Sequence, residues 1–174
     1  MLLCACGNGN SQTKYVDSVD GTSTAPQDNQ RIARGLKENT IDGEEVNVAD
    51  LKGKVVVINV WGSWCGPYRA EVPNFTKVAK ETKRKGVEFI GINTRDANRS
   101  LAVAFEKEYK VEHPSLYDPT GKIVMNGLPK GTLNPQTVPS TIVLDRKGRI
   151  AARTLRALSE EGLNGMIDSI VKEN

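Results

Sequence analysis

The sequence predicts one α/β domain, in which helices flank a central mixed sheet, and a polar tail before it. Three observations support this prediction. Strand-like and helix-like segments alternate from Ile32 onward, and residues 54–60 and 87–92 are apolar runs rich in β-branched residues, which suit strands covered on both faces. Near the C-terminus, residues 141–154 have the pattern of an antiparallel hairpin. A length of 174 residues is sufficient for one such domain and a tail.

A hairpin is predicted before the first central strand. The dipeptide Asp42-Gly43 favours a tight turn, and residues 37–41 and 45–48 on either side of it suit short strands. The run at 54–60 then follows as a buried strand with a parallel neighbour.

Two amphipathic helices are predicted in the middle of the chain. After Cys65 the apolar positions recur at helical spacing until Lys85 and Gly86 give a stop signal, and Pro73 is expected to kink this helix. The second helix follows the second strand. The residues expected to line its buried face are Leu101, Ala104, Phe105 and Tyr109.

The C-terminal third is expected to complete the sheet. A short strand is predicted at 115–117, a loop at 118–121, and paired strands at 141–145 and 149–154. Ser159 is expected to cap a final helix. The residues predicted to line the buried face of that helix are Leu163, Met166, Ile167, Ile170 and Val171.

Residues 1–31 are predicted to be a disordered tail and residues 32–174 the folded domain, because the opening stretch is polar and offers little apolar surface to bury. Its first residues resemble the end of a bacterial lipoprotein signal, since apolar and small residues precede Cys6 and a Gly/Asn/Ser-rich linker follows it. That resemblance implies lipid attachment at Cys6. Only five residues precede Cys6, fewer than such a signal needs. Two unpaired cysteines, Cys4 and Cys6, at a frayed terminus therefore remain the alternative.

Composition excludes several function classes. A formal net charge of +3, from 24 Lys and Arg against 21 Asp and Glu, is too small and too evenly spread to predict a nucleic-acid surface. No stretch reaches the roughly 20 apolar residues of a membrane-spanning helix. Three cysteines cannot form a disulfide scaffold. No metal site and no cofactor are expected, because His113 is the single histidine and is predicted to be a loop residue far from Cys65.

The residues that predict chemistry follow the first central strand. Cys65 stands at the junction between that strand and the next helix, where free backbone N–H groups and the helix dipole favour a thiolate. Trp64 and the turn of Gly66 and Pro67 are expected to keep the sulfur near the surface. A thiolate there predicts a nucleophile that attacks disulfides of other proteins. The alternative is an inert buried thiol.

Residues 64–67, Trp-Cys-Gly-Pro, resemble the active-site segment of thioredoxin-fold proteins. The flanking sequence narrows the resemblance to the TlpA/ResA-like, membrane-tethered thiol–disulfide oxidoreductases and extends it over residues 32–174. The features that carry it are the Asp42-Gly43 turn, residues 51–54, Glu71 and Pro73 after Cys65, residues 138–141, and residues 144–150.

The resemblance implies a thioredoxin-like fold with an N-terminal β-hairpin and an α/β insertion at about residues 96–125. It also implies that Cys65 attacks partner disulfides, that Glu71 is an active-site glutamate, and that a cis peptide bond joins Val138 to Pro139. Val138 would offer its backbone to a bound peptide. The other residues implied to line the substrate groove are Trp64, Gly66, Pro67 and Tyr68.

The function implied by this resemblance is extracytoplasmic thiol–disulfide exchange on cysteines of envelope proteins, including apocytochrome c and copper-site proteins. The implied partners are disulfide- or thiol-bearing envelope proteins, together with an external thiol reductant or a membrane electron donor. Membrane contact would run only through a lipid anchor on Cys6.

The sequence departs from the family pattern at Tyr68, because that pattern is Cys-x-x-Cys and the second cysteine would stand there. Without a thiol at this position, Cys65 can enter a mixed disulfide but cannot resolve it. Four explanations remain open: a natural or engineered form that traps partners, a monothiol protein resolved by a small external thiol, a redox-inactive peptide-binding or chaperone relative, and resolution by Cys4 or Cys6. A one-cysteine peroxidase is a weaker alternative.

The sequence also suggests roles for three residues in or near the motif. The ring of Tyr68 is expected to cover the groove rather than to bind the thiolate through its hydroxyl. Glu71 is either a proton-handling group with a raised pKa or an ordinary first-turn glutamate. Asn59, at the place where many thioredoxins carry a buried aspartate, is expected to be a hydrogen-bonded core amide.

Overall fold

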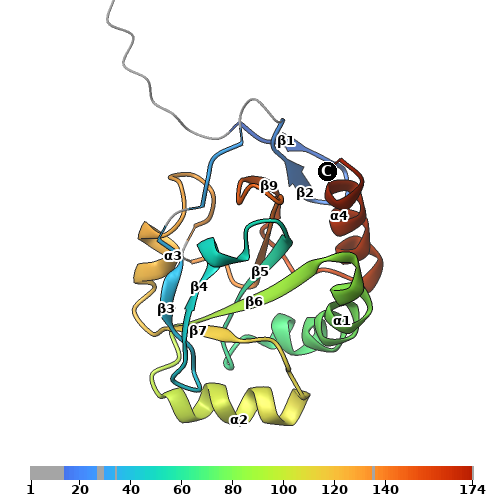
Figure 1. Ribbon diagram of the computed structural model, residues 1–174. Helices are drawn as coiled ribbons and strands as arrows, with labels where there is room; N and C mark the ends of the chain where they lie inside the picture. The colour runs from blue at the N-terminus through green and yellow to red at the C-terminus, as the bar shows by residue number, and fades with distance from the viewer. Residues whose placement is uncertain (1–13, 27–29, 34, 135, 174) are drawn as a thin grey trace, which may run out of the picture.

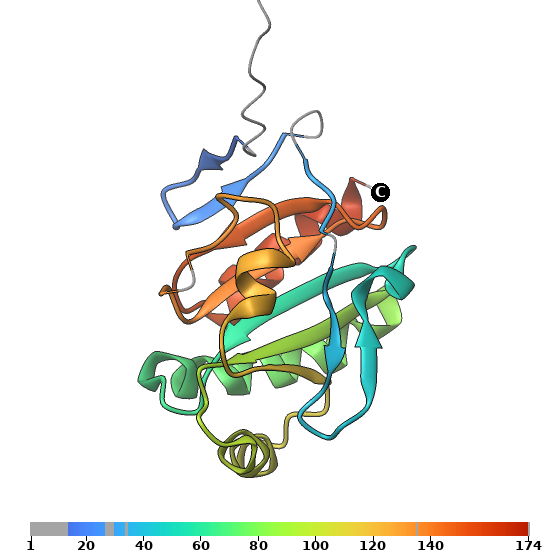
Figure 2. The ribbon, with the colours of Figure 1, turned by 90° about the vertical axis from the view of Figure 1, so that its left-hand side faces the viewer.

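The computed structural model describes residues 14–26, 30–33, 35–134 and 136–173. Its centre is a seven-stranded sheet with the strand order β1-β2-β9-β8-β5-β6-β7, and a separate hairpin is formed by β3 and β4 (Figures 1 and 2). The strands are β1 (Val16–Asp17), β2 (Thr22–Thr24), β3 (Lys37–Asn39), β4 (Glu45–Asn47), β5 (Val55–Trp61), β6 (Val87–Thr94), β7 (Ser115–Asp118), β8 (Ser140–Leu144) and β9 (Ile150–Thr154). The α-helices are α1 (Gly66–Thr82), α2 (Arg99–Tyr109), α3 (Lys122–Asn126) and α4 (Glu160–Lys172), and the 3-10 helices are η2 (Val48–Leu51) and η3 (Lys83–Lys85).

The middle of the sheet is mixed, as predicted. β5 pairs in parallel with β6, and β6 with β7, whereas β8 runs antiparallel to β5. All seven residues of β5 are buried, because helices and loops cover both faces of this strand. Its side chains alternate between two apolar clusters, with Val55 and Val57 on one face and Val56, Ile58 and Val60 on the other.

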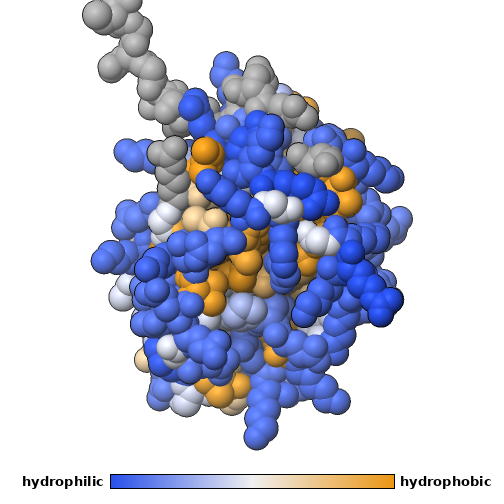
Figure 3. Space-filling model, viewed as in Figure 1, coloured by the Kyte–Doolittle hydropathy of each residue, from blue (hydrophilic) through white to orange (hydrophobic). Residues whose placement is uncertain are grey.

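The two faces of the sheet are covered differently. α1 and α4 lie side by side on one face, on the right of Figure 1, and they pack through Phe75, Val78 and Leu163. The hairpin β3–β4, η2 and α3 cover the other face. Figure 3 shows apolar side chains gathered at the centre of that view, bordered by hydrophilic ones. A pocket of about 230 Å³ lies there between η2 and the ends of β5 and β8, and Leu51 and Leu144 are part of its lining.

Most of the predicted elements are confirmed, with small differences at their ends. The predicted hairpin turn lies between β3 and β4, with Gly43 at a φ of 94° that favours glycine. The Ser159 side chain accepts a hydrogen bond from the Gly162 N–H at the start of α4, as expected of an N-cap. Pro73 lies within α1.

The predicted boundary between tail and domain, at residues 31 and 32, is wrong for the described part of the tail. β1 and β2 precede it, and β2 pairs antiparallel with β9 from Thr22 to Thr24. Sheet pairing is made by backbone groups, so a polar segment can join an edge without an apolar face. β1 and β2 consequently extend the sheet beyond the β8–β9 hairpin, so this hairpin lies inside the sheet and not at its edge. Residues 1–13, with Cys4 and Cys6, lie outside the described residues.

The predicted buried face of α2 is partly wrong. Leu101 is 52% exposed and Ala104 is also exposed, whereas Ala102, Phe105 and Glu106 are buried. The helix is turned so that Phe105 stacks against aromatic rings next to Cys65, and this tertiary contact outweighs the apolar pattern.

The helix α3 was not predicted. Its first backbone N–H groups, those of Ile123 and Val124, donate to Oδ2 of the buried Asp118 at 3.0 and 3.1 Å. The carboxylate therefore satisfies donors that a helix start leaves free. Among the helices in the described ranges, none combines the length and the apolar character needed to cross a membrane.

Two leucines on helices provide a matched test of this packing. Leu163→Ala is expected to lower the free energy of unfolding by about 3 kcal/mol, because this side chain is fully buried between α4 and the sheet. Leu101→Ala removes the same atoms from an exposed position and is expected to change it by less than about 0.5 kcal/mol. Urea denaturation measures both. Equal losses would contradict the orientation of α2 described above.

Candidate active site

Cys65 is the N-cap residue of α1, at the point where the chain leaves β5. Its side chain is only 4% exposed, so the prediction of a sulfur near the surface is wrong. The neighbours Trp64, Gly66 and Pro67 are exposed, as expected. The sulfur is covered because the loop before β8 packs on it: Sγ donates a hydrogen bond to the Val138 carbonyl oxygen at 3.5 Å.

The peptide bond between Val138 and Pro139 is cis, which confirms that prediction. Val138 is half-buried and packs against the cluster that contains Cys65, whereas Pro139 is buried. The loop before β8 therefore brings the Val138 backbone to the Cys65 sulfur. Its role in binding a partner remains a prediction.

A second loop, between β6 and α2, holds the Cys65 turn from the other side. The buried carboxylate of Asp96 accepts hydrogen bonds from the Ser63 N–H at 3.0 Å and the Ser63 hydroxyl at 2.6 Å. Trp64 Nε1 donates to the Thr94 carbonyl oxygen at 3.3 Å. Sequence reasoning missed Asp96, although its place just after the carboxyl end of a buried parallel strand is where functional residues gather in α/β sheets.

Tyr68 lies in the core, and the prediction that its ring covers the groove is wrong. The side chain is 1% exposed and stacks on Trp61 and Phe105, with ring centroids 5.2 and 5.5 Å away. Burial is the main cause that raises the Tyr68 pKa well above its usual value, with further contributions from the negative charges of Glu71, Glu106 and Cys65. The phenol therefore stays protonated and cannot act as a general base near neutral pH.

Glu71 projects from α1 into the interior and is 1% exposed. Burial raises the pKa of its carboxyl from 4.5 to about 7, whereas the hydrogen bond from the Leu158 N–H, at 2.7 Å, and the nearby Asn59 amide lower it. Its second oxygen, Oε2, has no hydrogen-bond partner among the described residues. The first-turn alternative is thereby excluded, since Glu71 lies beyond the first turn of α1. Asn59 is the core amide expected, and its Nδ2 donates to Thr141 Oγ1 at 3.2 Å.

A second buried carboxyl, Glu106, lies on the other side of the aromatic stack. The Ser115 hydroxyl donates to Glu106 Oε1 at 2.6 Å and accepts a hydrogen bond from Trp61 Nε1 at 3.1 Å. Burial raises the pKa of Glu106 to about 7, the Ser115 hydrogen bond lowers it, and the charge of Asp42 raises it. Nothing in the residue type separates this glutamate from the exposed Glu108, which lies two positions further along α2 and therefore on the opposite face of the helix.

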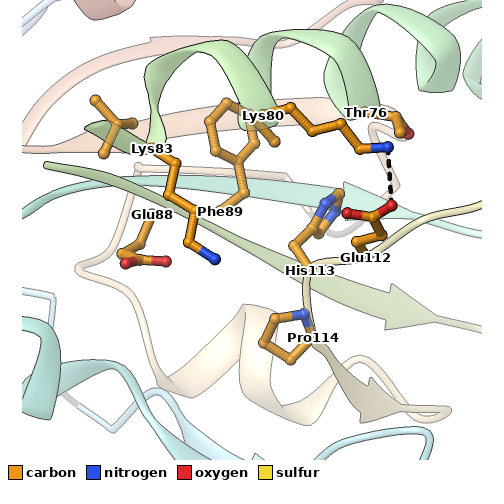
Figure 4. A pocket seen from close by; sticks show the side chains of 10 residues that line it. Thr76, Lys80, Lys83, Glu88, Phe89, Glu112, His113 and Pro114 are labelled. Carbon is orange, nitrogen blue, oxygen red and sulfur yellow. Dashed lines mark ion pairs between the residues drawn. The ribbon is translucent and has the colours of Figure 1, made fainter. Parts of the chain in front are cut away.

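His113 is outside any helix or strand, as expected, and it lies away from Cys65 in a small pocket against α1 (Figure 4). Its ring is 5.9 Å from that of Phe89, and burial lowers its pKa from 6.5 to about 4. Lys80 and Glu112 form an ion pair at the rim of the pocket, at 2.8 Å. Within the described residues, no cluster of three or more His, Cys, Asp or Glu side chains could hold a metal ion.

Comparisons with known proteins agree with this geometry. The model of the Redoxin family matches residues 21–167. The chain is 28% identical over 173 residues to the thiol-disulfide oxidoreductase ResA of Bacillus subtilis, covering 98% of this chain and 88% of that protein. A DsbF homologue from Corynebacterium diphtheriae superposes with a TM-score of 0.80 at 31% identity, over 91% of this chain and 99% of that one. A secreted thiol-disulfide isomerase from Corynebacterium glutamicum superposes with a TM-score of 0.77 at 27% identity, over 92% of this chain and 98% of that one.

The two buried carboxyls predict a stability that depends on pH. Between pH 4.5 and about 7 the unfolded chain loses protons that folded Glu71 and Glu106 retain, so each lowers the free energy of unfolding as pH rises, by on the order of 3 kcal/mol. The lowered pKa of His113 acts in the opposite direction, because this side chain destabilises the fold as pH falls from 6.5 to about 4.

Glutamine variants isolate one carboxyl from the other contributions. As pH rises from 4.5 to 8, the free energy of unfolding of Glu106→Gln is expected to increase by about 3 kcal/mol relative to that of the native chain. Urea denaturation at each pH measures this difference. The exposed Glu108→Gln is the control and is expected to leave the pH profile unchanged. Parallel profiles for the native chain and Glu106→Gln would show that this carboxyl does not titrate differently in the two states.

Proposed function

The chain belongs to the redoxin family, and we propose that it is an extracytoplasmic thiol–disulfide exchange protein that acts on cysteines of envelope proteins through Cys65. Its relatives include a thiol-disulfide oxidoreductase and a secreted thiol-disulfide isomerase, which supports this chemistry. The observation that carries the proposal is the contact between Cys65 Sγ and the Val138 carbonyl oxygen. It sets the only described cysteine beside a backbone edge suited to a bound peptide.

The first step is attack by the Cys65 thiolate on one sulfur of a partner disulfide. The partner's S–S bond breaks, a mixed disulfide forms at Cys65, and the partner's other sulfur leaves as a thiolate that takes up a proton. Cys65 is the N-cap of α1, so the attacking sulfur lies at the N-terminus of that helix. We assign Glu71 the handling of a proton near the sulfur, because a carboxyl with a pKa of about 7 exists in both forms at neutral pH.

Tyr68 determines what happens next. It supplies no thiol at the position that follows Cys65 by three residues, so the mixed disulfide persists until an external thiol attacks it. Two external thiols then complete the cycle: the first releases the partner in reduced form and takes its place on Cys65, and the second frees Cys65 and leaves as the disulfide of both. The partner gains two electrons and the external thiols lose two.

The groove and the location belong to the same proposal. Trp64, Gly66 and Pro67 form the exposed rim that a partner meets, and Val138 offers its backbone. Cys6 would carry a lipid that holds the domain at the outer side of the cytoplasmic membrane. Envelope proteins with cysteines, including apocytochrome c during cytochrome c maturation, would be available there as substrates. A thiol reductant or a membrane electron donor would supply the electrons.

A second candidate function is a peptide-binding relative without redox turnover. It is favoured by the coverage of the Cys65 sulfur, which leaves 4% of the residue exposed, and by the absence of a thiol at Tyr68. Such a protein would retain the Val138 edge and bind extended segments without forming a covalent bond.

Adduct formation distinguishes the two functions. Incubated with a disulfide-bonded peptide at pH 8 and then alkylated, the native chain is expected to gain the mass of one peptide strand on Cys65, and a small thiol such as glutathione is expected to remove it. Peptide binding measured by fluorescence polarisation with Cys65→Ser provides the control. Binding by this variant without any adduct on the native chain would favour the peptide-binding function.

Replacing Tyr68 tests whether one missing thiol blocks the cycle. Tyr68→Cys is expected to release the partner without an external thiol and to end with an internal disulfide to Cys65, as seen by mass spectrometry. Serine is nearly the size of cysteine but has no sulfur, so Tyr68→Ser is expected to keep the trapped adduct. Both variants leave a cavity beside Trp61 and Phe105 and are expected to lose about 3 kcal/mol of stability. Equal trapping by both would contradict this role of position 68.

A further inference from the structure

Three arginines surround the turn that carries Cys65, and each lies over an aromatic ring. The Arg95 guanidinium carbon is 4.5 Å from the centre of the Trp64 ring, that of Arg99 is 5.0 Å from Tyr117, and that of Arg69 is 5.6 Å from Phe105. Arg69 also donates from Nη2 to the Ser63 carbonyl oxygen at 2.9 Å. These three arginines and Trp64 are called the basic rim below.

The charge of the basic rim is not neutralised locally. None of its arginines forms an ion pair with a carboxylate of the described residues, although seven such pairs exist elsewhere. The acidic residues of the neighbouring loops, Asp96 and Asp118, are 2% and 3% exposed and are directed at backbone N–H, hydroxyl and amide donors. These two carboxylates therefore do not neutralise the exposed arginines of the basic rim.

Arg95 is held in place at a conformational cost. Its φ is 58°, in the left-handed region that residues other than glycine and asparagine rarely adopt. This conformation sets its side chain over Trp64, and Nη1 donates to Gln136 Oε1 at 3.3 Å. Gln136 lies two residues before Val138, so the guanidinium spans the loop after β6 and the loop that covers the Cys65 sulfur. A glycine at this position would remove the backbone strain, but the chain has an arginine there.

Stacked guanidinium groups are suited to bind carboxylates. A ring beneath the plane orients the group and leaves its in-plane N–H donors free for a bidentate contact. A side-chain carboxylate of a polypeptide meets this geometry when its own cysteine lies over Cys65.

We propose that the basic rim recognises partner proteins whose reactive disulfide is flanked by aspartate or glutamate. This inference rests on the proposed exchange at Cys65 and names the substrate class for it. The acidic segment would run over Trp64 and Arg95 while the adjoining residues reach Val138, so that attraction of opposite charges raises the rate of encounter and aligns the disulfide.

The test compares two disulfide-bonded peptides that differ only in their flanking residues, three Asp/Glu in one and three Asn/Gln in the other. The second-order rate constant of adduct formation on Cys65 is measured by mass spectrometry. At an ionic strength of about 20 mM the acidic peptide is expected to react about 10-fold faster, and at about 0.5 M the two rates are expected to converge.

Matched variants separate the basic rim from the overall charge of the chain. Arg95→Gln with Arg99→Gln is expected to reduce the preference to less than about 2-fold. The control, Arg84→Gln with Lys172→Gln, removes the same charge from exposed positions near the far ends of α1 and α4. Nineteen residues of nearly continuous helix place Arg84 about 28 Å from Cys65. This control is expected to keep the preference for the acidic peptide.

Arg95→Gly guards against a loss caused by misfolding. Glycine adopts a φ of 58° readily, so this variant is expected to melt at the native temperature or above it while it loses most of the preference. Equal rates for both peptides on the native chain would overturn the inference and leave the proposed function intact. A preference that survives in Arg95→Gln/Arg99→Gln would also overturn it. No adduct with either peptide would overturn the proposed function itself.

Discussion

The register between β5 and β8 determines where Cys65 lies relative to Val138. These buried antiparallel strands pair Val60 with Ser140, so the chain leaves β5 toward Cys65 at the same end of the sheet where it enters β8 from Val138. The distance of 3.5 Å from Cys65 Sγ to the Val138 carbonyl oxygen follows from that pairing. A one-residue slip would turn every side chain of β5 to the opposite face and would separate the sulfur from the backbone edge beside it.

The buried interior next to the sulfur has a low dielectric, which explains the raised pKa values of Tyr68, Glu71 and Glu106. Tyr68, Trp61 and Phe105 form a continuous stack, with Glu71 and Glu106 as acidic neighbours of the Tyr68 phenol. Burial without an ion-pair partner favours the neutral form of both carboxyls and raises their pKa values to about 7. A pKa of about 7 leaves the Glu71 carboxyl partly protonated near neutral pH, whereas an exposed glutamate would already be ionised there.

Sequence patterns predicted those elements whose packing is local or strictly periodic. The apolar run gave β5, the helical spacing gave α4, and the motif placed Cys65 and the cis bond before Pro139. The misses involve tertiary contacts. β2 joins the sheet through backbone pairing alone, and the partner of Glu106, Ser115, belongs to another strand. No sequence pattern indicates that the Cys65 sulfur is covered, because the covering residue, Val138, is 73 positions away.

Because Tyr68 is buried, its presence in place of a cysteine affects the packing of the core as well as the number of thiols in the motif. The family pattern has a cysteine at this position, whereas here the Tyr68 ring packs against both Trp61 and Phe105, which also contact each other at 5.2 Å between ring centroids. Trp61 in turn donates to Ser115, which donates to Glu106. A change at position 68 therefore alters the packing of Trp61, whose hydrogen bond to Ser115 leads to Glu106. Because Tyr68 and Cys65 belong to the same buried cluster, a substitution at position 68 changes the packing beside the sulfur as well as the presence of a second thiol.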